Sequence, residues 1–332
     1  MERSLAHLAP RNCGWAVGFL GALLTAALAA AAQPADQSAP QNSHPLQEVR
    51  VTASRLDRRT LKRVAIQFVK LHGAVSTTTD QIGRWRMDVC PQVTGLNPRA
   101  GAFVSRRVKA VARRVGAPTR GVGKRCAVDV EIVFTPQPQQ LLNHIAKAYP
   151  GLLGSARSAG DTIVRRAIQS WYLTGTKAEP GWEESPVRFG IETAQDAVSP
   201  PLPDGAHVDP AYGSGFAAGL AGSHLGKALS SELVHVLVVV DTRKVAGDSL
   251  RSISDYVAML ALTRMGSLDG CSGLPSIIDL LSSGCGSTAK PQALTAADTA
   301  YLKALYSADL EMNLNIELGD MRDRMVTAIA GR

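Results

Sequence analysis

Three residues are the strongest candidates for catalytic groups, and they lie far apart in the sequence: Glu131, His207 and Asp255. Glu131 belongs to a segment of alternating residues, and a carboxylate on such a strand could act as a general acid or base. His207 has acidic neighbours in a proline-rich segment, which suits a metal-binding or hydrolytic imidazole. Together they support one expectation, a hydrolase of unknown type with its site beneath that segment.

The segment that must position Asp255 spans residues 232–265 and is the most apolar part of the chain after the N-terminus. Residues 236–240 form an uninterrupted aliphatic run, which predicts a strand buried on both faces. Gly247 and Asp248 mark a turn. Ser252 or Ser254 is expected to cap the helix that follows, with an apolar face at helical spacing.

In zinc peptidases a helix that follows a buried strand carries the motif H-E-x-x-H, in which two histidines hold the metal and the glutamate is the general base. Laid on this pattern, the helix presents Ser254, Asp255 and Ala258. Serine and alanine are not zinc ligands, and no histidine occurs after His235. We therefore expect no metal and no cofactor, with His235 serving as a core or strand-end imidazole.

Three stretches resemble an uncharacterised family of exported proteobacterial proteins of unknown function: SISDYVAMLAL, CSGLPSIIDLL and LTAADTAYLKALY. The resemblance covers roughly residues 87–325, and its motifs are structural rather than catalytic. That family is distantly similar to metallopeptidase-like folds that have lost their metal ligands. The resemblance therefore implies a degenerate metallopeptidase-like architecture, and it implies nothing about a substrate.

Residues 1–32 have the pattern of a secretory signal peptide, with early positive charge, an Ala-rich apolar run and small residues at its end. They predict export to the periplasm of a Gram-negative bacterium or to the medium. No later stretch is long and apolar enough to span a membrane, so we expect no span after cleavage.

Residues 33–60 are expected to be a disordered linker, because their first half is rich in Pro, Gln, Ser and Ala. Within them, residues 48–55 (EVRVTASR) resemble a TonB box, the extended segment through which outer-membrane transporters pair with the TonB protein. A TonB-linked accessory protein is therefore a further alternative. An ordinary edge strand or linker end explains the same residues more simply.

Four cysteines follow the signal-like segment: Cys90, Cys126, Cys271 and Cys285. An even number in an exported chain predicts two disulfides. Of the three possible pairings we favour Cys90–Cys126 and Cys271–Cys285, because each pair brackets one local unit, and each bridge should contribute about 2–4 kcal/mol. A zinc site is the alternative, but the chain has no C-x-x-C and no histidine close to these cysteines.

Charge is unevenly spread along the chain, whose formal net charge is +8. Residues 50–125 hold 18 Lys and Arg against 3 acidic residues, whereas residues 126–332 hold 16 against 22. The densest cluster lies on a predicted helix over residues 100–115, whose valines form an apolar stripe. The opposite, basic face comprises Arg106, Arg107, Lys109, Arg113 and Arg114.

This basic face is either a solvated surface or a contact for an anionic envelope component. Nucleic acid is excluded as a partner by export and by the scarcity of aromatic residues for stacking on bases.

The remaining pattern predicts a strand over residues 128–134, a helix over 139–148 and a helix over 161–169 that runs into a short strand at 171–173. Near the C-terminus, Thr295 and Asp298 form a capping box, and a second helix is expected over 308–328. Strands and helices mix without regular alternation, which favours the α+β class, with a mixed or antiparallel sheet packed against helices.

We expect one domain over residues 61–332, which could divide into sub-units 61–177 and 212–332 joined by a proline-rich loop. The predicted function is that of an exported protein that binds a partner or an envelope component and is not an enzyme.

Overall fold

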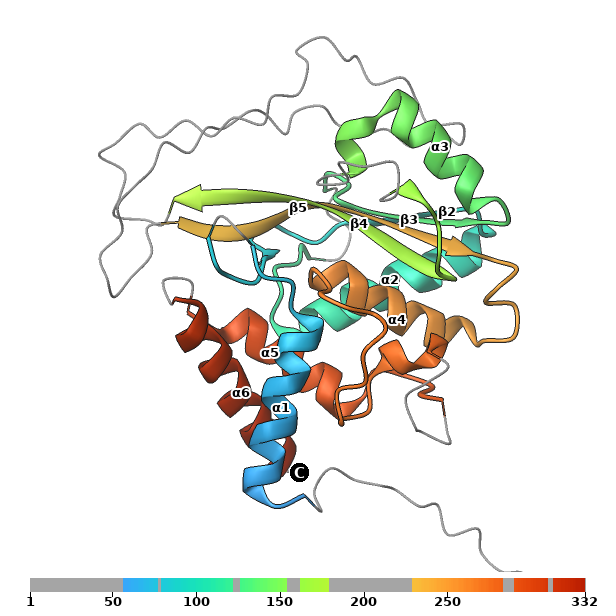
Figure 1. Ribbon diagram of the computed structural model, residues 1–332. Coiled ribbons are helices and arrows are strands. Elements are labelled where there is room, and N and C mark those ends of the chain that lie inside the picture. Colours follow the sequence, from blue (N-terminus) through green and yellow to red (C-terminus); the bar gives the residue numbers. More distant parts are fainter. Residues whose placement is uncertain are drawn as a thin grey trace, which may run out of the picture. The chain divides into compact units, whose positions relative to one another are not determined.

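The structure is a computed structural model, and it describes residues 56–76, 79–121, 126–153, 162–178, 229–282, 290–309 and 313–331. The described residues belong to one compact unit. Its core is a mixed, open five-stranded sheet with helices on both faces (Figure 1). The expected α+β class is therefore confirmed.

The sheet is built around the long strand β5 (Leu229–Asp241). β4 (Ile168–Ala178) pairs with it antiparallel along one edge. Two strands pair parallel with its other edge. The short β1 (Arg84–Trp85) lies beside Glu232 and Leu233, near the start of β5, and β3 (Val130–Thr135) lies beside residues 236–241. β2 (Pro91–Thr94) pairs parallel with β3 and completes the order β2-β3-β5-β4. The predicted strand at residues 236–240 is thus the centre of the sheet.

A register shift in β5 keeps apolar residues on the more heavily covered face. Leu173 of β4 pairs with His235, but the next residue, Thr174, pairs with Leu233, so Val234 has no counterpart. Such a bulge reverses the alternation of side chains between the two faces. As a result Leu233 packs into the same core as Val236, which strict alternation would not allow.

One face of the sheet is covered by five helices that contribute to the main core (Figure 1). They are α1 (Arg58–His72), α2 (Pro98–Val115), α4 (Leu250–Leu262), α5 (Ala296–Ser307) and α6 (Leu314–Ala330). The opposite face carries α3 (Pro138–Ala148) and the 3-10 turn η2 (Pro150–Leu153), which form a smaller core with Trp171, Leu237 and Val239. A second 3-10 turn, η4 (Ile277–Leu281), packs beside α4.

Side chains at the helix starts explain where the helices begin. Asn97 caps α2 and Asn313 caps α6, each accepting an amide hydrogen bond from the first turn. The predicted capping box of Thr295 and Asp298 is present at the start of α5. α4 is capped by Ser249 rather than by Ser252 or Ser254, so that prediction was wrong by one helical turn.

Two other sequence expectations differ from the structure. The helix expected over residues 161–169 is not formed, because β4 already begins at Ile168 and continues for 11 residues. Pairing along the whole length of β5 outweighs the local preference of this segment. The helix α1 was not expected, and it begins at Arg58, inside the range assigned to the linker, where Asp57 caps its first turn.

A buried ion pair joins β1 to the C-terminal helices. Arg84 donates to the Glu317 carboxylate at 2.5 Å and to the carbonyl oxygens of Leu305 and Ala308. Glu317 also accepts the Ile82 amide at 3.2 Å. Both charged side chains are almost fully buried, so they fix α5 and α6 against the edge of the sheet. Within the described residues no helix is long and apolar enough to cross a membrane.

Candidate functional site

The exposed face of α2 carries a group of five cations. The valines of its predicted stripe are buried in the core, at Val104, Val108, Val111 and Val115. Arg99, Arg106, Arg113 and Arg114 point away from that core and are exposed, and Lys109 is half-buried. None of these five cations takes part in the ion pairs formed among the described residues. The charge of the four arginines is therefore available to a partner, whereas Lys109 lies close enough to Asp129 to lower the pKa of that carboxyl.

Phe103 lies on the same side of α2 and is 37% exposed. It stands four residues after Arg99 and three before Arg106, so the helix places the three side chains next to one another. We call Arg99, Phe103, Arg106, Lys109, Arg113 and Arg114 the α2 surface. It combines positive charge with one aromatic ring.

Arg107 departs from the predicted basic face. Its guanidinium forms a two-pronged ion pair with Asp255 of α4, from Nε to Oδ1 and from Nη2 to Oδ2, the latter at 2.9 Å. This contact raises the pKa of the Arg107 guanidinium. Asp255 also accepts the Leu294 amide at 2.9 Å and is fully buried. The pair fastens α2 to α4, and it gives Asp255 a structural role in place of the predicted catalytic one.

The other two positions of the peptidase-like pattern on α4 are equally enclosed. Ser254 and Ala258 are both 0% exposed. The Ser254 hydroxyl donates to the Leu250 carbonyl one turn earlier, at 2.6 Å. Since the helix is buried on all sides at these residues, it has the surroundings of a core helix rather than of a cleft wall.

Glu131 and His235 are brought together by the sheet. Glu131 lies on β3 and His235 on β5, and the register of these neighbouring strands puts His235 Nε2 3.7 Å from Glu131 Oε1. Both residues are buried, at 5% and 6% exposure. Neither ring nitrogen of His235 has a hydrogen-bond partner. Of the predicted catalytic residues, Glu131 is the one placed beside a second titratable group with open bonding capacity.

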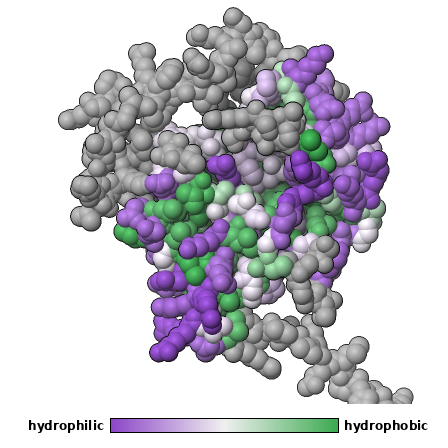
Figure 2. Space-filling view, viewed as in Figure 1, coloured by the Kyte–Doolittle hydropathy of each residue, from purple (hydrophilic) through white to green (hydrophobic). Residues whose placement is uncertain are grey.

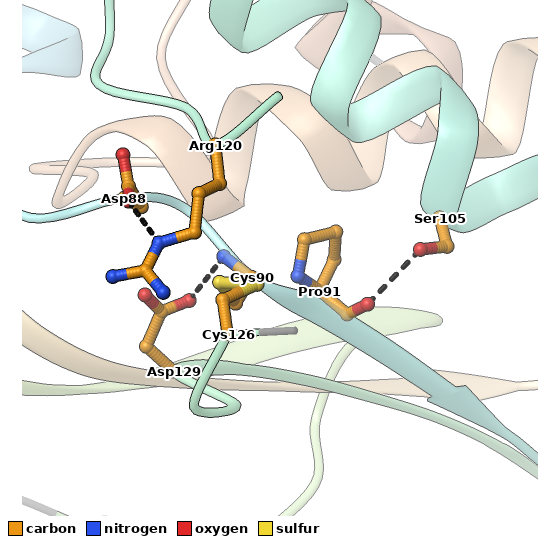
Figure 3. The surroundings of a disulfide bond; sticks show 7 residues. All are labelled: Asp88, Cys90, Pro91, Ser105, Arg120, Cys126 and Asp129. Atoms are coloured by element: carbon orange, nitrogen blue, oxygen red, sulfur yellow. Dashed lines mark hydrogen bonds and ion pairs between the residues drawn. A yellow bond between two sulfur atoms is a disulfide. The ribbon is translucent and has the colours of Figure 1, made fainter. Parts of the chain in front are cut away.

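The predicted disulfide Cys90–Cys126 is present and joins the segments that lead into β2 and β3 (Figure 3). Asp129 lies next to it, and its carboxylate accepts the Cys90 amide at 2.7 Å. Burial raises the pKa of the Asp129 carboxyl from 3.8 to about 7, against the lowering effect of that hydrogen bond. Cys271 is also disulfide-bonded, and its predicted partner Cys285 lies outside the described residues.

Several predicted features cannot be placed for the same reason. His207, the signal-like segment, the TonB-box-like segment and the proline-rich loop all lie outside the described residues. Among the residues that are described, no three or more His, Cys, Asp or Glu side chains are grouped in a way that could hold a metal ion.

The view in Figure 2 shows mainly hydrophilic side chains over α3 and over the first turns of α1. Those first turns carry exposed cations as well, at Arg58 and Arg59. One of the α1 cations has an acidic partner on the neighbouring helix α6, where Lys62 pairs with Asp323 at 3.6 Å.

No protein-family profile, curated protein or solved structure matches this chain. The sequence identified the α2 cations, Glu131 and Asp255 individually. It contained no signal for the Arg107–Asp255 contact or for the approach of His235 to Glu131, since both depend on how separate elements pack.

Proposed function

We propose that this is an exported, non-enzymatic protein that binds anionic, phosphate-bearing lipid headgroups of the cell envelope through the α2 surface. The observation that carries the proposal is the set of outward cations on α2 that have no acidic partner among the described residues. Each Lys or Arg held near an anionic membrane contributes about 1 kcal/mol. A cluster of this size is enough for specific, salt-sensitive binding.

Lipid headgroups fit the α2 surface better than a purely ionic polymer does, because of Phe103. An aromatic ring among arginines can enter the headgroup region while the charges pair with phosphates. The apolar stripe of the helix is already buried in the core, so α2 would lie on the membrane through its polar side and would not insert.

Export is supported by the signal-like N-terminus and by the Cys90–Cys126 disulfide, since disulfides persist in oxidising compartments. The absence of an enzymatic role is supported by the buried state of Ser254, Asp255 and Ala258. These residues have the surroundings of a core helix, in which their side chains serve packing.

Vesicle co-sedimentation tests the proposal. The mature chain should sediment with phosphatidylcholine vesicles that contain phosphatidylglycerol, and not with phosphatidylcholine alone. Raising the salt from about 0.05 M to about 0.5 M should release it, because screening shortens the reach of exposed charges. Equal sedimentation with both kinds of vesicle, or no sedimentation with either, would refute the proposal.

A further inference from the structure

The Glu131–His235 pair lies on the face of the sheet that carries α3, away from α4. Side chains alternate along each strand, so His235 shares its face with Leu237 and Val239, which pack with α3 and η2. Val236 and Val238 point to the opposite face, into the core that contains α4. A site at this pair is therefore separate from the peptidase-like helix.

Both side chains of the pair lack ordinary hydrogen bonds. A separation of 3.7 Å between His235 Nε2 and Glu131 Oε1 is too long for one. Both imidazole nitrogens are fully buried and have no partner. Among the described residues, His235 is the only group that pairs with the Glu131 carboxylate. Leaving a buried polar group unsatisfied costs about 1–3 kcal/mol, and more for a charged one, and a bound water or ion is one arrangement that removes this cost.

We propose that Glu131 and His235 bind a divalent transition-metal ion of the zinc class. Zinc bonds to imidazole nitrogen and carboxylate oxygen are each about 2.1 Å long, so two such ligand atoms can stand up to about 4.2 Å apart. The separation of 3.7 Å is within this limit and corresponds to an angle of about 120° at the ion. A bridging water would need hydrogen bonds of about 2.8 Å to both atoms, and the angle between them at the water oxygen would be only about 80°.

The chemistry of the two groups selects the class of ion. Imidazole nitrogen suits zinc, copper or nickel, whereas calcium and magnesium prefer sites made of oxygen atoms alone. Since the described residues offer two protein ligands here, water or a small anion completes the coordination of the ion. The binding is expected to be weaker than at a structural zinc site with four protein ligands.

The experiment uses the mature, disulfide-bonded chain after treatment with a chelator. Isothermal titration with Zn²⁺ should show one saturable site per chain, and Co²⁺ should give visible absorption bands of a nitrogen- and oxygen-bound ion. Glu131→Gln and His235→Gln should each weaken Zn²⁺ binding at least tenfold and remove the rise in Tm that Zn²⁺ causes. His144→Gln is the matched control, because His144 is an exposed histidine on α3.

Three results would overturn the site. They are no saturable binding by the parent chain, binding retained by both Glu131→Gln and His235→Gln, and an equal loss in His144→Gln. Since Glu131→Gln preserves side-chain size, it gives a decisive result even where His235→Gln folds poorly. Vesicle binding by these variants should be unchanged, which separates this site from the α2 surface.

Discussion

Arg107 of α2 and Asp255 of α4 form an ion pair in which the carboxylate is fully buried while a quarter of the arginine side chain is exposed. The pair turns one of the predicted basic-face residues inward and leaves its neighbours facing outward. Adjacent arginines on one helix therefore have different roles. Arg107 holds the fold together, and Arg106 is available for binding.

Replacing Arg107 should destabilise the protein, whereas replacing Arg106 should not. Arg107→Gln leaves the buried Asp255 charge with the Leu294 amide as its remaining partner, and breaking a buried pair costs about 3–5 kcal/mol. Arg106→Gln changes an exposed side chain, so its effect on the free energy of unfolding should stay within about 0.5 kcal/mol. Urea unfolding followed by tryptophan fluorescence measures both. Equal losses would show that Arg107 is not structural.

The buried Arg84–Glu317 pair should show strong coupling in a double-mutant cycle. Glu317→Leu alone leaves the Arg84 charge unpaired and should cost about 3–5 kcal/mol. Adding Arg84→Met removes that charge and should restore part of the loss, although the Leu305 and Ala308 carbonyls then lose their donor. The free energy of unfolding of the two single variants and the double variant gives the coupling. Strictly additive losses would contradict it.

Asp129 should make stability decrease as the pH rises. Its pKa is raised from 3.8 in the unfolded chain to about 7 in the fold. The folded state therefore keeps its proton through a range in which the unfolded state loses it, and stability falls between about pH 4 and pH 7. Each pKa unit corresponds to about 1.4 kcal/mol.

Asp129→Asn keeps an acceptor for the Cys90 amide and cannot ionise. It should match the parent chain at about pH 4 and be more stable at about pH 8, in urea unfolding at both pH values. Asp248→Asn, at a turn away from the disulfide, serves as the control. If the free energy of unfolding of the parent chain does not decrease over this range, the pKa of Asp129 is not raised by folding and the prediction is wrong.

Much of the fold follows from local sequence pattern. The valine stripe of α2 marks one buried face, and the helix was predicted close to its actual bounds. The aliphatic run at residues 236–240 correctly predicted the second half of β5, but the strand begins earlier, at Leu229. The capping box at Thr295 is an equally local signal. Cys90 and Cys126 were paired correctly because they bracket one local unit, which consists of β2 and α2.

What the sequence could not provide is the relation between elements. The sequence predicted a short strand at residues 171–173, and pairing with β5 extends it in both directions to residues 168–178, into the end of the range predicted as a helix. Glu131 meets His235 because of the register between β3 and β5, which no local pattern in either strand determines. The sequence alone does not show that Asp255 has a partner. The packing of α2 against α4 brings Arg107 to it.

Binding of the α2 surface to anionic lipid is tested most directly by two triple variants that lose the same charge. Arg106→Gln/Arg113→Gln/Arg114→Gln removes three cations of the α2 surface, and Arg58→Gln/Arg59→Gln/Lys70→Gln removes three exposed cations of α1. At about 1 kcal/mol per cation, the α2 variant should bind phosphatidylglycerol-containing vesicles about a hundredfold more weakly than the parent chain. The α1 variant should bind within a fewfold of the parent. Retained binding by the α2 variant, or an equal loss in both, would contradict the assignment of lipid binding to α2.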